Sequence, residues 1–150
     1  MDEPLSPERR ETLRTWFENG IPFNRALGLR VDALSRGRAV LRVPWKTELT
    51  GDASRPAVHG GVLSMLIDTA GGAACFAMLD SDEDRVSTVD LRVDYLRPGP
   101  AADLVCEAEV IRLGNRVAVT RARVYSVERP TDGDGDPVAL GQAVYNIVRR

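Results

Sequence analysis

The segment VHGGVLSMLIDTAGGAACFAML, residues 58–79, constrains the fold of this chain more than any other. After His59 its only formal charge is Asp68, and the remaining residues are apolar or small. An acidic residue near the centre of the run argues against a membrane span. A helix without a wide polar face is buried nearly all round. We therefore predict a buried helix whose small residues, 70–74, allow it to lie close to a sheet.

The rest of the pattern predicts what surrounds this helix. Ser6 and Pro7 are typical of a helix start, and Gly20 of its end. Residues 29–34 and 39–44 predict two strands, and residues 46–58 a polar loop. Four strands of period two and 9–12 residues each follow the helix, within 87–97, 103–113, 115–128 and 137–149.

Tight turns join these strands, so neighbouring strands are antiparallel. We predict an α+β fold, in which a long central helix is wrapped by a curved six-stranded antiparallel sheet, with an extra N-terminal helix. A chain of 150 residues fits one domain, with residues 1–27 as an N-terminal helical extension. Within residues 87–97 the period of two places Val89 with Leu91 on one face and Thr88 on the other.

Composition excludes several kinds of partner. The net charge of −2 provides no basic field for nucleic acid and no polybasic tail for membranes. The acidic N-terminus lacks the apolar core of a signal peptide. Cys75 and Cys106 match no metal-ligand spacing and are typical of reduced thiols. We expect a cytoplasmic protein.

Asp68 is the first candidate for chemistry. An ionised carboxylate in a dry core needs partners. One interpretation is structural: Asp68 touches solvent at a helix edge or bonds to Ser64 one turn earlier. The other is a carboxylate at a cleft wall, acting as base or nucleophile.

The sequence His59-Gly60-Gly61 stands where the loop becomes the helix. The first N–H groups of a helix are unpaired and lie at the positive end of its dipole. Gly60 could therefore provide an oxyanion site, or the glycines could serve a tightly packed helix entry. His59 could act as a general base, although we favour a structural role in which its ring bonds to the backbone.

Three other sites are disfavoured. A Ser-His-Asp triad fails because His59 lies a full turn or more from Ser64 and no G-x-S-x-G turn is present. A metal site fails because the chain has one histidine. The sequence TDGDGDP, residues 131–137, imitates a calcium loop, but proline and alanine stand where glycine and glutamate are required. We predict a solvated hairpin loop there.

Six arginines lie between residues 92 and 123. They form either an outer sheet face balanced by Glu107 and Glu109, or, at Arg97 and Arg116 near strand ends, a contact for a phosphate-bearing ligand.

The chain resembles the hotdog-fold acyl-CoA thioesterases, specifically the phenylacetic-acid-degradation type. The resemblance covers most of the chain and depends on the segments PFNRALGLRV, HGGVLSMLIDTAGGAA, STVDLRVDYLRPG, LGNRVAV and ALGQAVYNIV. The helix and third-strand motifs carry most of its specificity.

This resemblance implies catalytic roles for particular residues. The Gly60 N–H, at the start of the helix that His59 precedes, polarises the thioester carbonyl. Asp68 activates water or attacks the carbonyl, and Thr88 helps to orient the water. The site forms between two subunits, so Gly60 of one chain faces Asp68 of the other. Such dimers commonly pair again into tetramers.

The resemblance also implies substrate contacts. The Arg97 region and the turn Asn115-Arg116 would face the CoA nucleotide, with Gly61 beside the oxyanion donor. The acyl pocket would involve the neighbourhoods of Phe23 and Met65. No cofactor is implied beyond the CoA of the substrate.

The chain departs from the family pattern at one position. Many relatives carry Asn or Gln six residues before the histidine, where this chain has Ala53, with Asp52 adjacent. The missing amide supports an alternative, a non-catalytic hotdog module that binds acyl-CoA or an aromatic ligand. A hotdog dehydratase is disfavoured, since that chemistry is typical of a different helix motif with a catalytic histidine.

Overall fold

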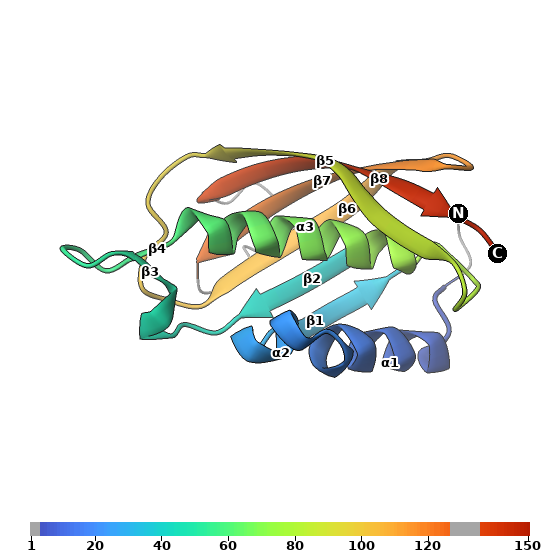
Figure 1. Ribbon diagram of the computed structural model, residues 1–150, viewed down its shortest axis with the longest axis horizontal. Helices are drawn as coiled ribbons and strands as arrows, with labels where there is room; N and C mark the ends of the chain where they lie inside the picture. Colours follow the sequence, from blue (N-terminus) through green and yellow to red (C-terminus); the bar gives the residue numbers. More distant parts are fainter. Residues whose placement is uncertain (1–3, 127–135) are drawn as a thin grey trace.

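The computed structural model describes residues 4–126 and 136–150 (Figure 1). Most of the predicted hairpin loop 131–137 therefore lies outside the described residues. In chain order the elements are α1 (Pro7–Thr15), the π-helical turn η1 (Trp16–Gly20), α2 (Pro22–Leu27), β1 (Arg30–Ser35), β2 (Arg38–Val43), the 3₁₀ turn η2 (Thr47–Leu49), β3 (Thr50–Asp52), β4 (Ala57–Val58), α3 (Gly60–Phe76), β5 (Arg85–Tyr95), β6 (Leu104–Leu113), β7 (Val117–Ser126) and β8 (Ala139–Val148).

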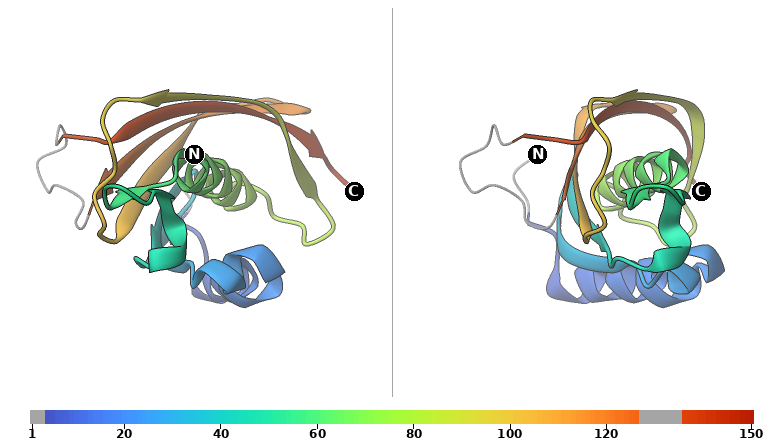
Figure 2. Two further views of the ribbon diagram at one scale, coloured as in Figure 1. Left: turned by 60° about the vertical axis from the view of Figure 1, so that its left-hand side comes forward. Right: turned by 90° about the vertical axis from the view of Figure 1, so that its left-hand side faces the viewer.

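A six-stranded antiparallel sheet curves around α3 in the order β1-β2-β6-β7-β8-β5. Figure 2 shows the sheet passing over one side of this helix and the N-terminal helices lying on the other. The predicted α+β hotdog architecture is confirmed. No helix within the described ranges is long and apolar enough to cross a membrane.

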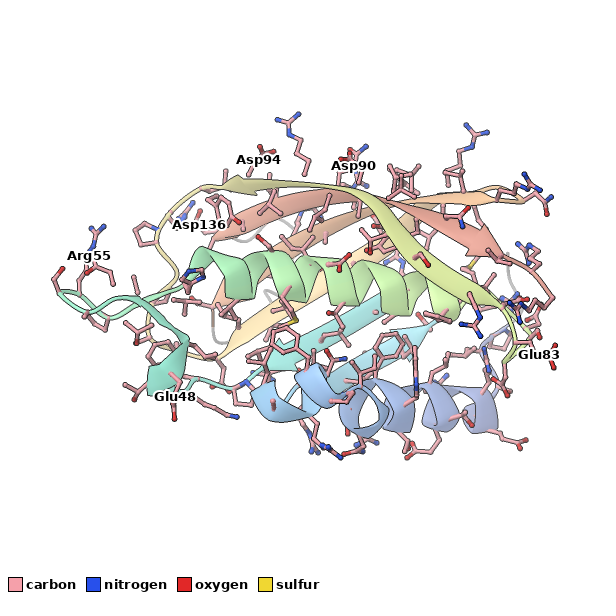
Figure 3. All side chains as sticks on the ribbon, viewed as in Figure 1. Glu48, Arg55, Glu83, Asp90, Asp94 and Asp136 are labelled. Atoms are coloured by element: carbon pink, nitrogen blue, oxygen red, sulfur yellow. The ribbon has the colours of Figure 1, made fainter. Side chains whose placement is uncertain are left out.

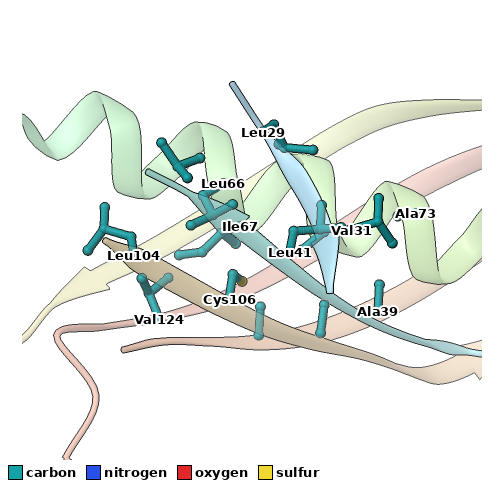
Figure 4. Packing of buried hydrophobic residues seen from close by; sticks show 14 of the residues in the cluster. Leu29, Val31, Ala39, Leu41, Leu66, Ile67, Ala73, Leu104, Cys106 and Val124 are labelled. Atoms are coloured by element: carbon teal, nitrogen blue, oxygen red, sulfur yellow. The ribbon is translucent and has the colours of Figure 1, made fainter. Parts of the chain in front are cut away.

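The core lies between α3 and the concave face of the sheet. Leu66 and Ile67 are almost completely buried and point toward residues of β2 and β6 such as Leu41 and Cys106 (Figure 4). Truncating one such leucine to alanine typically costs about 2–5 kcal/mol. A Cβ on Gly71 would overlap the Tyr145 hydroxyl. Gly71 thus confirms the expected close approach of helix and sheet.

The N-terminal segment covers one edge of the sheet. Ser6 begins α1, its Oγ accepting from the Arg9 N–H at 3.1 Å. Within the π-helical turn η1, the buried carboxylate of Glu18 accepts from the backbone N–H of Val31 on β1 at 2.9 Å. An edge strand presents unpaired backbone groups, and this bond satisfies one of them. β5 forms the opposite edge of the sheet.

The structure corrects two predictions. The polar loop 46–58 contains the turn η2 and a small two-stranded sheet, β3 with β4. In β5, the pairing with β8 shifts between Thr88 and Asp90, so Val89 lies in a β-bulge. Val89 is 67% exposed instead of facing inward with Leu91. Beyond the bulge, Asp90 and Asp94 point away from the helix (Figure 3).

Candidate active site

Asp68 and Thr88 meet on the partly open face of α3. Asp68 is half-buried, and the Thr88 hydroxyl donates to its Oδ1 at 2.7 Å. The hydroxyl is the donor and the carboxylate oxygen the acceptor in this bond. The expected partner, Ser64, instead donates to the Gly60 carbonyl at 3.2 Å and contacts the Tyr95 hydroxyl. The prediction of a hydrogen bond between Asp68 and Ser64 is therefore wrong.

Tyr145 of β8 contacts the backbone of Asp68, and the sequence did not predict this contact. Its hydroxyl donates to the main-chain carbonyl of Asp68 at 2.7 Å. Burial, with a smaller contribution from the nearby Asp68 charge, raises the pKa of Tyr145. The hydroxyl therefore stays protonated and remains a donor. One feature of the sequence could have indicated this contact: a glycine within the helix, Gly71, which leaves room for the tyrosine of the last strand.

His59 caps the start of α3. Its Nδ1 accepts from the Gly61 N–H at 2.8 Å, which is the backbone bond expected of a structural ring. The Gly61 N–H is thereby engaged within the chain. Gly60 comes first in the helix, where N–H groups have no intrahelical acceptor.

Tyr95 of the same chain occupies the space where a side chain at position 60 would lie. A Cβ there would lie 3.2 Å from Cε1 of Tyr95, whose hydroxyl also donates to the Gly60 carbonyl at 3.3 Å. Gly60 and Asp68 are eight residues apart on one helix, about 12 Å along its axis. One chain therefore does not bring this N–H and this carboxylate to the same carbonyl group.

The predicted substrate-contact residues are dispersed in one chain. Phe23 is 61% exposed on α2, whereas Met65 is half-buried on α3. Arg97 follows β5 and pairs with Asp136.

The turn Asn115-Arg116 precedes β7, whose first residue, Val117, pairs with Asn146. Tyr95, at the end of β5, pairs with Ala139 at the opposite end of β8. Arg97 and Arg116 therefore lie at opposite ends of the sheet. Arg121 pairs with Glu109 at 2.6 Å, as expected for the charge-balanced interpretation of the arginines.

Asp52, beside Ala53, is engaged in its own turn. Its Oδ1 accepts from the hydroxyl and N–H of Ser54 at 2.6 and 2.9 Å, and Arg55 donates to its Oδ2 at 2.9 Å. These bonds, the Ser54 hydroxyl first, lower the pKa of Asp52 to about 2. Asp52 thus stabilises the β3–β4 connection, and nothing in these contacts replaces an amide at position 53.

No group of three or more histidine, cysteine or acidic residues suited to a metal ion occurs in residues 4–126 and 136–150. The chemistry of the described site is that of one carboxylate, a hydroxyl and a helix N-terminus.

Comparison with known proteins assigns the family. The sequence profile of the thioesterase superfamily matches residues 56–132. The chain belongs to the thioesterase superfamily. Among relatives of this thioesterase-superfamily protein, the medium/long-chain acyl-CoA thioesterase YigI of Escherichia coli is 33% identical over 125 residues, covering 75% of this chain and 81% of YigI.

Solved structures of the superfamily agree with the fold. A thioesterase family protein from Silicibacter pomeroyi superposes with a TM-score of 0.80 at 29% identity, covering 92% of this chain and 96% of that one. A protein from Shewanella oneidensis related to the thioesterase superfamily also gives 0.80 at 29% identity, covering 93% and 95%. The expectation of a thioester hydrolase is confirmed by this membership.

Proposed function

We propose that this protein hydrolyses acyl-CoA thioesters to a free acid and CoA, with Asp68 as the reacting carboxylate. The observation that carries the proposal is the Thr88–Asp68 hydrogen bond on the partly open face of α3, in a thioesterase-superfamily chain. The similarity to YigI, a medium/long-chain acyl-CoA thioesterase, supports the substrate class.

The reaction needs one carboxylate and one oxyanion donor. As a base, Asp68 takes a proton from water while the water oxygen bonds to the thioester carbon; as a nucleophile, it forms that bond itself and water then cleaves the anhydride. The carbon–sulfur bond breaks, and CoA leaves as a thiolate that takes up a proton. A main-chain N–H such as that of Gly60 stabilises the carbonyl oxygen as it becomes negative.

Thr88 and Tyr145 act as positioning residues in this proposal. The Thr88 hydroxyl holds one carboxylate oxygen of Asp68, which orients the other toward the reacting atom. Tyr145 holds the helix backbone at the same residue. His59 holds the first turn of α3 through its bond to the Gly61 N–H, next to the proposed oxyanion donor Gly60.

The complete site requires a second copy of the chain. Gly60 and Asp68 of one chain are too far apart to act on one carbonyl, so we propose that Gly60 of each subunit serves Asp68 of the other. The outer edge of β5 is the contact: it is 11 residues long, and within the described residues only β8 pairs with it. A long unpaired edge is a template for another strand. Two such dimers would form a tetramer.

We extend the proposal to the finer assignments. Residues 1–150 would form a single hotdog domain with residues 1–27 as its N-terminal extension. The helix and third-strand motifs together support the phenylacetic-acid-degradation type, and the two free cysteines, Cys75 and Cys106, support a cytoplasmic enzyme. Phe23, Met65, Arg97, Asn115, Arg116 and Gly61 would contact substrate across the dimer.

A thiol-release assay over acyl-CoA esters from acetyl to hexadecanoyl, together with an aryl-acetyl ester, tests the proposed function. Release of CoA that depends on Asp68 supports it. Calorimetric binding of the esters without release of CoA would contradict it and favour the non-catalytic module.

A further inference from the structure

Two adjacent glycines in α3 have opposite surroundings. Gly71 is buried against Tyr145 and Thr120, so its lack of a side chain is required by packing. Gly72 is half-buried, and a Cβ placed on it would meet only Cε1 of Tyr145, at 3.9 Å, an ordinary contact. Glycine within a helix costs about 1 kcal/mol relative to alanine. Packing within the described chain gives no reason for that cost at Gly72.

Gly72 lies midway between the proposed reacting carboxylate and an aromatic side chain. Asp68, Gly72 and Phe76 are spaced by four residues, so they follow one face of α3. All three are half-buried, as is Thr69 beside Asp68, whereas the other residues between them, Ala70, Gly71 and 73–75, are buried. The open face of the helix is therefore a strip that leads from Asp68 to Phe76.

A cavity of about 800 Å³ lies at the far end of this strip. Its apolar lining comes from Leu13 and Trp16 of the N-terminal helices, Phe76 of α3 and Val86 of β5. Val86 precedes Thr88 by two residues and shares its face of β5, so the cavity lies on the same side of that strand as Thr88. Its charged lining residues come mainly from the 81–85 segment.

The cavity has an aromatic wall that the chain leaves partly uncovered. The rings of Trp16 and Phe76 pack edge to face at 5.1 Å, and Trp16 is 41% exposed. An exposed aromatic surface in a concavity of this size is typical of a ligand pocket. A ligand that is polar at one end and apolar along its length would suit a path from Asp68 to this wall.

We propose that the strip over Gly72 and the Trp16–Phe76 cavity hold the alkyl tail of the acyl group. The inference rests on the proposed function, because it places the thioester carbonyl at Asp68. Eight residues of helix separate Asp68 from Phe76, about 12 Å. An extended chain advances about 1.2 Å per bond, so a tail of about ten carbons reaches the cavity. Gly72 keeps the path open, and the cavity selects medium and long chains.

The first test replaces Gly72 by leucine and measures kcat/KM for butanoyl-CoA and dodecanoyl-CoA. The Cβ has room, so the helix is expected to form, and the isobutyl group blocks the path about 6 Å beyond Asp68. The ratio of dodecanoyl to butanoyl kcat/KM should fall at least about tenfold. An unchanged ratio in an active enzyme overturns the inference and leaves the proposed function standing.

A second variant separates the tail from a second copy of the chain as the occupant of this space. Thr12→Trp places a ring at the cavity from the exposed side of α1, and Thr15→Trp, outside the cavity lining, is its matched control. Thr12→Trp should lower kcat/KM for hexadecanoyl-CoA relative to octanoyl-CoA at least about fivefold, with Thr15→Trp like wild type. If both Gly72→Leu and Thr12→Trp change the oligomeric state without changing chain-length preference, the space belongs to a subunit contact and the inference is wrong.

Discussion

The hydroxyl of Thr88 reaches the carboxylate of Asp68 because a bulge interrupts β5 one residue later. Val89 is the extra residue, and it turns outward. Without it, the alternation that places Leu91 toward the helix would place Thr88 on the other face of the sheet. The bulge therefore lets one strand provide an apolar wall to the core and a polar group to Asp68.

Replacing Thr88 with valine should lower kcat for the best acyl-CoA about tenfold and change KM little. The variant loses a hydrogen bond to a charged group, and such a bond contributes about 1.5–3 kcal/mol. Thr88→Ser keeps the hydroxyl and should retain most of the activity. Equal kcat values for Thr88→Val and wild type would show that this bond does not position Asp68.

The two helix glycines should respond oppositely to alanine. Gly71→Ala forces a Cβ against Tyr145 and Thr120 and should destabilise the fold by about 2 kcal/mol or more. Gly72→Ala meets no such obstacle and should stabilise it by about 0.5–1 kcal/mol through helix propensity. Urea unfolding of the two variants measures both values, and a destabilised Gly72→Ala would mean that the space over this residue is already occupied.

An acidic residue at position 89 should separate the subunits. Val89 is 67% exposed on the edge strand, so Val89→Asp leaves the folded chain intact but places a charge in the proposed contact. Sedimentation should show monomers, and thioesterase activity should disappear with them. Ile111, 48% exposed on the interior strand β6, provides the matched control Ile111→Asp, expected to keep the dimer. A fully active monomer would contradict a shared site.

Two buried thiols should make the fold less stable in alkali. Burial raises the pKa of Cys75 to about 12, and burial, with a smaller effect of Glu107, raises the pKa of Cys106. Unfolded thiols ionise near pH 8.5–9. Above that pH the unfolded chain releases protons that the folded chain keeps, so the free energy of unfolding falls as pH rises toward 12.

For Cys75 the loss is about 1.4 kcal/mol per pH unit at most. Urea unfolding at pH 8 and pH 10 should show a smaller decrease in Cys75→Ala than in wild type. The same decrease in both proteins would mean that the thiol is not protected by burial.

The sequence predicts the fold well because its signals are long. The apolar helix and the strands after it each persist for ten or more residues, so their periods are clear. The segment 46–58 was misread as loop because strands of two and three residues carry no detectable period. The exposure of Val89 was missed for a different reason: a bulge depends on the pairing of β5 with β8, which a single strand does not reveal.

Residue patterns predicted fewer features of the site than of the fold. Asp68 is conspicuous as one carboxylate in an apolar helix, and His59 as a helix cap. Thr88 entered only through the family resemblance, because the unbroken period assigned it to the wrong face. Tyr145 was missed because a tyrosine in a strand has no local mark that it bonds to a helix carbonyl 77 positions away in sequence.

The central claim is that Asp68 reacts with a CoA thioester, and Asp68→Asn tests it most directly. The amide keeps the size of the side chain, so circular dichroism and the unfolding midpoint should stay close to wild type. Under single-turnover conditions with the best acyl-CoA, the rate of CoA release should fall by at least about 10²-fold, the low end for a general base. Release at the wild-type rate by folded Asp68→Asn would contradict the account.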